Sequence, residues 1–368
     1  MINYDEFLNK KLVDVKPSGI RKFFAIAEEM DNVISLGVGE PDFLTPWHIR
    51  QTGIDYLEQG LTRYTANAGL AELRNEISNF YARNYLVKYD PKSEVLVTVG
   101  GSEGIDMAIR SIIQEGDEVL IIEPSFVCYK PIVEVTGGVA VPVPTYEKND
   151  FKVTPEDIEK AVTDKTKAIV LPYPNNPTGA ILSVNELEAL ADVIIKYNLF
   201  VISDEIYAAL TYTPEGHTTI ATIDGMQERT IIINGFSKTY SMTGWRLGYA
   251  LGPAPIIKQM TKLHQFAIMS APTNSQYAAI DALKNGDFDI MKMRDDYDMR
   301  RRFTVDGFRK IGLDCFEPMG AFYAFPCIKS TGLSSEEFAE KLIKSKRVAV
   351  VPGDAFGESG EGYIRVSY

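Results

Sequence analysis

The sequence predicts an α/β fold with two parts, a large domain in which helices flank a mostly parallel sheet and a smaller α+β domain. The first observation is that apolar, β-branched runs alternate with helical patterns from about residue 94 to about residue 250. Such alternation is typical of a parallel sheet with helices on both faces. The second observation is that helices dominate after about residue 255, before a short mixed segment closes the chain. A length of 368 residues agrees with about two domains.

The N-terminal part of the chain carries helical patterns separated by loops. Pro17 and Ser18 introduce the first of these patterns, as such residues do at helix starts. Gly37, Gly39 and Pro41 then interrupt regular structure, so we expect the backbone there to turn tightly or to approach another group closely. The helices expected in this part cover 21–28, 48–60 and 71–85.

Short apolar runs in the central part predict buried strands that alternate with helices. The expected strands are 95–99, 119–122, 168–171, 200–203, 230–233 and 248–251. The expected helices are 105–113, 151–163 and one that Ser183 and Glu186 open as a capping box. The loops that follow these strands would meet at one edge of the sheet, where such sheets bind ligands.

The C-terminal part predicts a smaller mixed unit. Helices extend to Arg309, and Ser334 with Glu337 caps a further helix that ends at Lys344. The expected strands are 320–326, 348–353 and 363–367. We therefore divide the chain into a large domain, 46–290, and a small domain formed by 1–45 and 291–368.

Composition and charge exclude several classes of protein. The net charge of −12 argues against a nucleic-acid or anionic membrane surface, which needs a basic patch. Cys128, Cys315 and Cys327 show neither metal-ligand spacing nor a disulfide framework, so we expect no metal. No apolar run approaches the roughly 20 residues that span a bilayer, and the acidic N-terminus does not resemble a signal peptide. We expect a cytoplasmic protein that contacts neither nucleic acid nor membrane.

Lys238 follows the predicted strand 230–233 and is the most informative residue of the chain. Burying an ammonium without a partner is costly. This lysine therefore either extends its amine to solvent, or has a pKa lowered by desolvation, so that the neutral amine attacks a carbonyl group. The glycine-rich turn 100–104 opens a helix after a strand and is a potential anion site. The residues expected at this edge are Gly101, Ser102, Glu103, Phe126, Asn176, Asp204, Tyr207 and Lys238, and their clustering favours a functional role.

Several motifs occur in a fixed order along the chain. They are Glu-Pro-Asp-Phe at 40–43, Tyr-Thr-Ala-Asn-Ala-Gly-Leu at 64–70, Asn-Asn-Pro-Thr-Gly at 175–179, Ser-Asp-Glu-Ile-Tyr at 203–207, and Ser-Lys-Thr-Tyr-Ser-Met-Thr-Gly-Trp-Arg-Leu-Gly-Tyr at 237–249. Together they resemble the class I family of pyridoxal-phosphate aminotransferases, of fold type I, and most closely the branch of prokaryotic aspartate and archaeal aromatic aminotransferases. The resemblance covers essentially the whole chain. It implies a ping-pong enzyme that moves an amino group between an L-amino acid (aspartate, aromatic or similar) and a 2-oxo acid such as 2-oxoglutarate.

The resemblance implies a role for each residue near the cofactor ring, with Lys238, Asp204 and Tyr207 as catalytic residues. Lys238 resembles the lysine that forms a Schiff base with pyridoxal 5'-phosphate and then carries the proton at the substrate Cα. Asp204 resembles the carboxylate that keeps the pyridine nitrogen protonated, so that the ring withdraws electrons. Tyr207 and Asn176 resemble the pair that hydrogen-bonds the ring oxygen. Phe126 stands where the family stacks an aromatic side chain on the ring, a position at which many aspartate-specific members have Trp.

The resemblance also implies a phosphate site and a shared active site. The implied phosphate donors are Gly101, Ser102, Glu103, Ser237 and Arg246. Among them Arg246 would make planar, charge-assisted contacts. Gly235 stands where many relatives have a serine, which removes one donor. Tyr64 resembles a tyrosine that reaches the phosphate of the neighbouring subunit, which implies a homodimer.

The implied substrate site consists of Gly39, Phe126, Asn176 and Arg365. Arg365 resembles the arginine that clamps the substrate α-carboxylate through two parallel hydrogen bonds, and Gly39 would offer a backbone N–H. Side chains near the entrance, Ile20, Phe23 and Phe24, could favour aromatic or apolar donors, and core packing explains them equally well.

Two alternatives to an aminotransferase remain open at this point. The first is a pyridoxal-phosphate β-lyase of the same fold, which would carry the same core motifs. The second is a non-catalytic regulatory relative. Lys238, Asp204 and Arg246 argue against the second, because a binding protein needs no Schiff-base lysine.

Overall fold

The computed structural model describes residues 2–15, 17, 30 and 32–368. The helix expected at 21–28 and the candidate specificity residues Ile20, Phe23 and Phe24 lie outside the described residues. No helix in the described ranges is long and apolar enough to cross a membrane.

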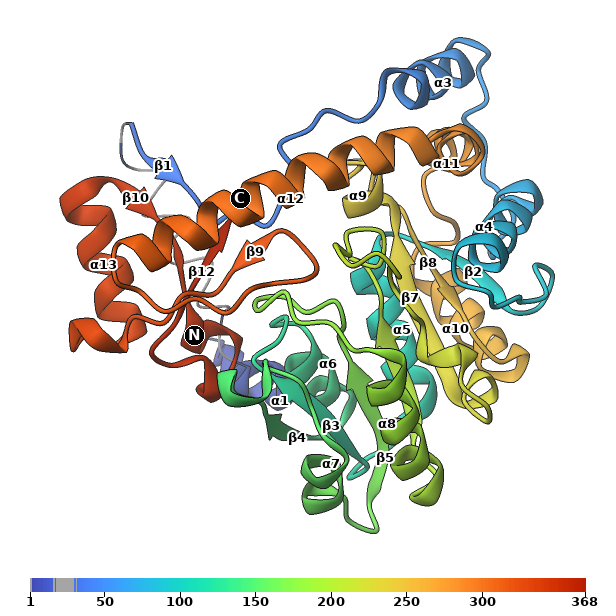
Figure 1. Cartoon of the computed structure of the whole chain (residues 1–368). Coiled ribbons are helices and arrows are strands. Elements are labelled where there is room, and N and C mark those ends of the chain that lie inside the picture. The colour runs from blue at the N-terminus through green and yellow to red at the C-terminus, as the bar shows by residue number, and fades with distance from the viewer. Residues whose placement is uncertain (1, 16, 18–29, 31) are drawn as a thin grey trace.

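A central sheet organises the large part of the molecule (Figure 1). Within the described chain its seven strands run in the order β2-β8-β7-β6-β5-β3-β4. They are β2 (Val95–Thr98), β3 (Glu118–Glu123), β4 (Val139–Pro144), β5 (Thr166–Leu171), β6 (Phe200–Asp204), β7 (Thr230–Gly235) and β8 (Gly248–Leu251). Only β8 pairs antiparallel with its neighbours β2 and β7. The predicted mostly parallel sheet is confirmed.

Strand β4 was not predicted, and neither was helix α6 (Tyr129–Thr136) that precedes it. The strand contains Pro142 and Pro144, which cannot donate to a neighbouring strand. Since β4 lies at the end of the sheet and pairs only with β3, one side of its backbone needs no partner. An edge position thus accommodates prolines that conceal a strand in the sequence.

Helices cover both faces of the sheet because successive strand residues point in opposite directions. Ile231 and Ile233 pack with α5 (Gly101–Ile112), α6 and α10 (Ala254–Ala267). Ile232, between them, packs instead with α4 (Ala71–Asn84) and α11 (Thr273–Asn285). Helices α7 (Pro155–Ala161) and α8 (Val184–Lys196) cover the same second face farther along the sheet.

Capping boxes fix the starts of three helices in the described chain. The predicted capping boxes are present at α8 and at α13 (Ser335–Lys346). Helix α7 is shorter than the predicted 151–163, because Thr154 and Asp157 form a capping box that starts the helix after Thr154.

The smaller part contains short strands and helix α13 (Figure 1). Its strands are β1 (Ile34–Ser35), β9 (Tyr323–Ala324), β10 (Val348–Ala349), β11 (Val351–Pro352) and β12 (Ile364–Ser367). β11, β12 and β9 form one antiparallel sheet, and β1 pairs parallel with β10. The run predicted as one strand at 348–353 is therefore two strands in different sheets, and the strand predicted at 320–326 is confined to two residues.

Helix α12 (Asp287–Lys310) leads from the large part to the small one along the top of Figure 1. The predicted domain boundary between 290 and 291 falls within its first turn. The division into 46–290 and 1–45 with 291–368 stays a prediction.

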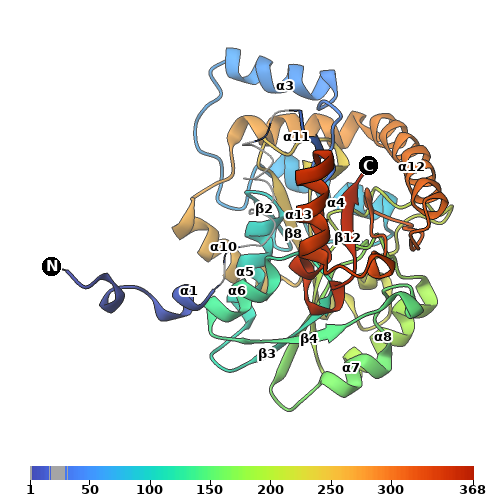
Figure 2. The same ribbon diagram turned by 90° about the vertical axis from the view of Figure 1, so that its left-hand side faces the viewer.

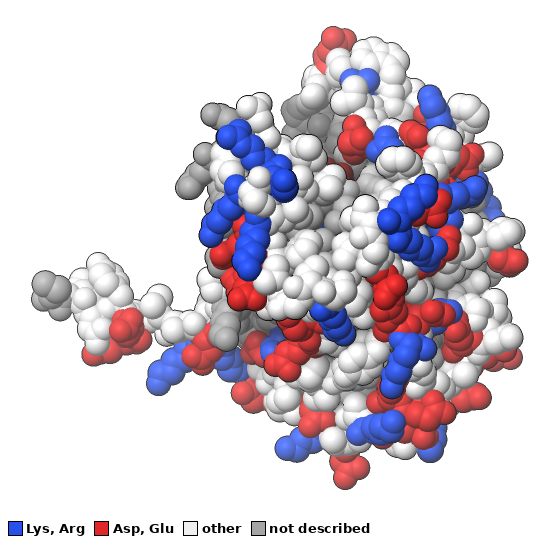
Figure 3. Space-filling view, turned by 60° about the vertical axis from the view of Figure 1, so that its left-hand side comes forward, with Lys and Arg blue, Asp and Glu red and all other residues white. Residues whose placement is uncertain are grey.

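Peripheral segments complete the described chain. Helix α1 (Lys10–Asp14) belongs to an N-terminal segment that projects from the body in Figure 2, and α3 (Trp47–Glu58) lies at the top of that view. Helix α3 packs on α11. An added Cβ on Gly53 of α3 would lie 2.8 Å from the Trp245 ring, so the close approach of α3 to Trp245 requires a glycine at this position. The face shown in Figure 3 carries acidic and basic side chains intermixed.

Candidate active site

The loops at the carboxyl ends of the parallel strands meet around a cavity of about 520 Å³. The predicted site residues that line it are Gly39, Gly101, Ser102, Phe126, Asn176, Asp204, Tyr207, Ser237, Lys238, Arg246 and Arg365. The first comes from the loop after β1 and the last from β12 in the small part. The remaining residues follow the strands of the central sheet. The clustering predicted for this edge is thus present.

Lys238 lies in α9 (Phe236–Thr239), a single helical turn that directly follows β7. Its Nζ donates a hydrogen bond to the carbonyl oxygen of Gly39. Burial lowers the pKa of Lys238 to about 8; the Glu40 carboxylate opposes this shift, and the positive charges of Arg365 and Arg246 add to it. A lowered pKa increases the fraction of neutral amine, the form that attacks a carbonyl carbon.

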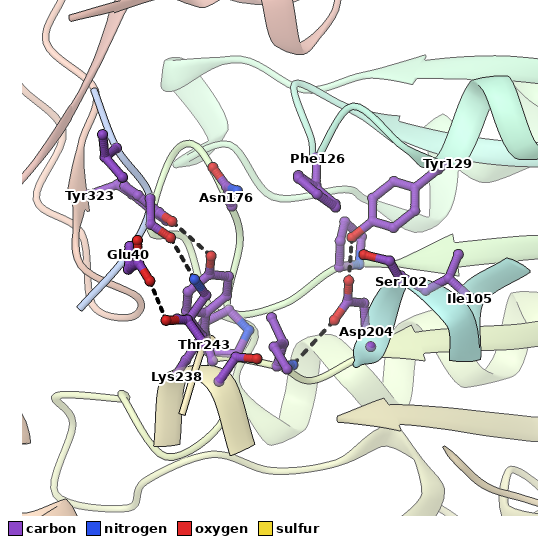
Figure 4. Close-up of a pocket in the computed structure, with 18 of the residues that line it drawn as sticks. Glu40, Ser102, Ile105, Phe126, Tyr129, Asn176, Asp204, Lys238, Thr243 and Tyr323 are labelled. Carbon is purple, nitrogen blue, oxygen red and sulfur yellow. Dashed lines mark hydrogen bonds between the residues drawn. The ribbon is translucent and has the colours of Figure 1, made fainter. Parts of the chain in front are cut away.

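Asp204 ends β6 and points to the face covered by α5 and α6 (Figure 4). One carboxylate oxygen accepts a 2.6 Å hydrogen bond from the Tyr129 hydroxyl, and the other accepts from the Ile206 N–H at 3.2 Å. Burial raises the pKa of Asp204 to about 6, although both hydrogen bonds favour the charged form. A cationic partner at this position would recover the free energy that desolvation costs the carboxylate.

Arg365 is a buried cation that has no acidic partner among the described residues. Its side chain is 3% exposed, and no carboxylate among the described residues pairs with it. Nη1 donates to Asn176 Oδ1 at 2.9 Å and Nη2 donates to the Gly37 carbonyl at 2.6 Å, whereas the buried Nε has no hydrogen-bond partner in the described part of the chain. A guanidinium held in this way is poised for an anionic ligand.

The N-terminus of α5 and Arg246 lie on one side of the cavity, where their partial and full positive charges suit an anion. An added Cβ on Gly100 would lie 2.6 Å from Arg246 Nη2, so the guanidinium lies directly on the turn where α5 begins. The hydroxyls of Ser102 and Ser237 line the same cavity. The structure also gives a reason for glycine at position 235, since a Cβ there would lie 3.0 Å from Gly248 Cα in the neighbouring strand.

Two predicted cofactor residues do not line this cavity. The side chain of Glu103 turns away from the cavity. One of its carboxylate oxygens accepts a hydrogen bond from the Val99 N–H, and the other lies 3.1 Å from Nδ1 of the buried His264. Only the backbone N–H of Glu103 therefore remains as a candidate phosphate donor. Tyr64 is 79% exposed, and its predicted role concerns a neighbouring subunit.

Sequence reasoning missed four residues whose polar side chains line the cavity. Tyr129 holds Asp204, and the Tyr323 hydroxyl lies 2.8 Å from the Tyr207 hydroxyl. Glu40 and Thr243 join through a short hydrogen bond that ties the segment after β1 to the loop before Arg246 (Figure 4). Tyr129 follows Phe126 by three residues in the segment after β3. This position near a predicted site residue was the one signal in the sequence that could have indicated it. The role of Tyr323 depends on how the small sheet lies beside β6.

A second polar cluster lies behind the cavity, around Glu205. This carboxylate is fully buried and accepts hydrogen bonds from Ser203 at 3.0 Å, from Tyr81 at 3.2 Å and from Thr219. His217 Nε2 lies 3.3 Å from it. The Tyr81 hydroxyl also accepts from Asn234 at 2.8 Å, so the cluster extends to β7 just before the Lys238 turn.

The residues present fit the cofactor that the resemblance implies. A phosphate matches the α5 N-terminus with Arg246, a cationic ring nitrogen matches the buried Asp204, and an aldehyde matches the Lys238 amine. Arg365, which pairs with no carboxylate of the described residues, leaves a place for a substrate carboxylate. All these groups face one cavity.

Comparisons with known proteins agree with this arrangement. The family described as aminotransferase class I and II matches residues 31–368. A putative aminotransferase of Bacillus subtilis is 52% identical over 98% of this chain and 94% of its own length. An aspartate aminotransferase of Pyrococcus abyssi is 46% identical over 98% of this chain and 93% of its own.

A solved structure is similar over nearly the whole chain as well. The aromatic aminotransferase of Pyrococcus horikoshii superposes with a TM-score of 0.90 at 44% identity, covering 95% of this chain and 93% of that one. Family, identity and fold therefore agree with the geometry of the cavity. The chain belongs to the class I and II aminotransferase family, of fold type I, and is a pyridoxal-phosphate-dependent aminotransferase.

Proposed function

We propose that the cavity catalyses transamination through Lys238, Asp204 and Tyr207, with an L-amino acid as donor and a 2-oxo acid as acceptor. When bound, pyridoxal phosphate supplies an aldehyde carbon for the lysine and an electron-withdrawing ring beside the substrate Cα. Lys238 moves the proton at the substrate Cα. Its lowered pKa suits this, because a base near neutrality can both accept and return a proton.

Asp204, Tyr207 and Asn176 are proposed to orient the ring. The Asp204 carboxylate accepts from the ring nitrogen while Tyr129 holds it in place. Asn176 already accepts from Arg365 through its oxygen, so its amide N–H groups remain available to donate to the ring oxygen. Tyr207 is proposed as the second donor. Phe126, which lines the cavity, would stack on the ring.

The phosphate is proposed to bind at Gly101, Ser102, the backbone N–H of Glu103, Ser237 and Arg246. The substrate α-carboxylate is proposed to bind Arg365, assisted by the Gly39 N–H. The observation that carries this function is the buried Arg365 without an acidic partner in the described chain. Its geometry selects for a planar anion such as a carboxylate.

The shared-site homodimer is also a proposal. Tyr64 is 79% exposed, and exposed apolar side chains of the same N-terminal region include Leu44 and Trp47. An opening between 40–45 and 241–246 lies next to Arg246, on the phosphate side of the site. A tyrosine of a second copy would enter there, and sedimentation as a monomer would contradict this. We also propose a cytoplasmic location, which suits the free Cys128, Cys315 and Cys327.

A half-reaction tests the function directly. Purified protein loaded with pyridoxal phosphate is mixed with single amino acids, aspartate, glutamate, tyrosine and phenylalanine, without any oxo acid. We expect the absorbance band of the bound cofactor to convert to that of its amine form, and 2-oxoglutarate to restore the band. The amino acid that converts it fastest is the preferred donor. Release of pyruvate or ammonia instead would contradict transamination and indicate the β-lyase.

The Arg365 interpretation has its own control. Arg365→Gln should raise KM for the donor about 100-fold, because a buried charge-assisted pair is lost. As a control, Arg302→Gln removes an exposed cation and should leave KM unchanged. An unaltered KM in Arg365→Gln would contradict the proposed carboxylate site.

A further inference from the structure

Two buried tyrosine hydroxyls face each other at the junction between the large sheet and the small one. Tyr207 follows β6, and Tyr323 lies on β9. Their hydroxyl oxygens are 2.8 Å apart, and the rings meet edge to face with centroids 5.7 Å apart. Tyr323 lines the same cavity as Tyr207. The pair therefore joins two parts of the molecule at the wall of the active site.

The Tyr323 side chain contacts the substrate side of the cavity as well. Arg365 lies on β12, the strand that pairs with β9, and its guanidinium is 4.5 Å from the centroid of the Tyr323 ring. An added Cβ on Gly39 would lie 2.5 Å from the Tyr323 hydroxyl, so this hydroxyl occupies the space that Gly39 leaves free. Gly39 is also the residue whose carbonyl accepts from Lys238. Figure 4 shows Tyr323 and Lys238 in the same cavity.

A count of protons gives the pair a direction. Each hydroxyl carries one proton and can donate once. Either oxygen can be the donor while the two tyrosines pair only with each other. Once Tyr207 donates to the ring oxygen of the cofactor, its proton is committed, and the bond between the tyrosines persists only if Tyr323 donates. Among the described residues, Tyr207 is the hydrogen-bond acceptor within reach of the Tyr323 hydroxyl.

We propose that Tyr323 is a positioning residue for the transamination reaction, whose hydroxyl donates to Tyr207 and so fixes Tyr207 as a donor to the cofactor's ring oxygen. This inference rests on the role proposed for Tyr207. A donor that is itself hydrogen-bonded is oriented and polarised. Without Tyr323, the Tyr207 hydroxyl can rotate and offer a lone pair instead of its proton.

The hydroxyl can be removed without removing the ring. In Tyr323→Phe the ring still packs on Arg365 and on Phe322, whose ring centroid is 4.6 Å away. A matched control is Tyr297→Phe in the same aromatic cluster, because the buried Tyr297 hydroxyl has no hydrogen-bond partner among the residues that the structure describes. Tyr297 takes no part in the proposed chemistry.

The measurement is the pH titration of the absorbance of the bound cofactor. A donor to the ring oxygen stabilises its negative charge and lowers the pH at which the lysine-cofactor linkage loses its proton. Tyr323→Phe should therefore raise the midpoint by about 0.5 to 1 pH unit, the effect of weakening one hydrogen bond. Tyr297→Phe should leave it unchanged. Tyr323→Phe should lower the melting temperature of the cofactor-free protein somewhat more than Tyr297→Phe does, because it leaves the buried Tyr207 hydroxyl without its partner. A purely structural role would lower the melting temperature without moving the midpoint.

A double-mutant cycle tests whether Tyr323 acts through Tyr207. Tyr207→Phe alone should raise the midpoint more than Tyr323→Phe does. Adding Tyr323→Phe to Tyr207→Phe should then have no further effect. Equal shifts with and without the Tyr207 hydroxyl, or no shift in Tyr323→Phe, would overturn the proposal. No shift in Tyr207→Phe would instead overturn the role proposed for Tyr207.

Discussion

Asp204 and Glu205 are neighbours in the chain, yet they lie on opposite faces at the end of β6. Asp204 faces the cavity, where two hydrogen-bond donors hold its carboxylate and its pKa rises to about 6 because it is buried. Glu205 faces the rear, where three hydroxyl groups and His217 surround it. The alternation of strand side chains separates two acidic residues into two different environments.

The difference teaches how the fold divides its polar groups. At the front, Asp204, Lys238 and Arg365 are buried with fewer partners than their charges require, so a ligand can complete them. At the rear, both carboxylate oxygens of Glu205 already accept hydrogen bonds without a ligand. Groups kept incomplete for binding lower the stability of the unliganded fold. Substitutions at the front should therefore change activity, and substitutions at the rear should change stability.

The largest expected effect is at Lys238. Lys238→Met should lower kcat by at least about 10³-fold, because the proposed nucleophile and proton carrier is lost. The same change should not destabilise the cofactor-free protein at pH 7. Burial holds the pKa of Lys238 at about 8, below its ordinary value of 10.5, so the buried ammonium opposes folding by up to about 3 kcal/mol at that pH. Urea unfolding and kcat measure the two effects.

The control for Lys238→Met is the exposed Lys196, which pairs with Glu159 at the surface. Lys196→Met should leave kcat unchanged and alter the free energy of unfolding by less than about 1 kcal/mol. If Lys238→Met destabilised the cofactor-free protein by more than its control, the front of the sheet would not be the incomplete region described above.

Next in size is the effect of breaking the rear cluster. Glu205→Ala should lower the free energy of unfolding by about 3 to 5 kcal/mol, because the buried partners Tyr81, Ser203 and Thr219 lose their common acceptor. The neighbouring change Asp204→Ala should cost the cofactor-free protein less than about 1 kcal/mol, since it also removes an unfavourable buried charge. Urea denaturation of both variants makes the comparison, and equal losses would contradict it.

This contrast also explains what the sequence could predict. The front residues Asn176, Asp204 and Lys238 follow apolar runs that are recognisable as strands, so their meeting at one edge follows from topology alone. Apart from Ser203 on β6 itself, the partners of Glu205 come from α4 and from the loop 217–219, and no local pattern joins these to β6. The positions of Tyr323 and of the Glu103 side chain likewise depend on contacts with residues far away in the sequence, Tyr207 and His264.

The smallest expected effect concerns the hydrogen bond from Tyr129 to Asp204 in the cofactor-free protein. The pKa of Asp204 is about 6 when folded, above its ordinary value of 3.8. Between these values the folded protein binds more protons than the unfolded chain, so this residue's contribution to stability falls as the pH rises from about 4 to about 6. Tyr129→Phe removes a donor to the charged form, which raises the pKa of Asp204 further and extends the fall to higher pH.

Tyr129→Phe should therefore cost about 1 kcal/mol more at pH 7 than at pH 4, where Asp204 is protonated and depends less on the donor. Tyr240 supplies a matched control, because its buried hydroxyl has no hydrogen-bond partner and Tyr240→Phe should give the same change at both pH values. Asp204→Asn in the Tyr129→Phe background should abolish the extra loss at pH 7. If that loss persisted, it would not arise from the Asp204 carboxylate. The Tyr129 hydroxyl would then stabilise the fold by an amount that does not depend on the charge of Asp204.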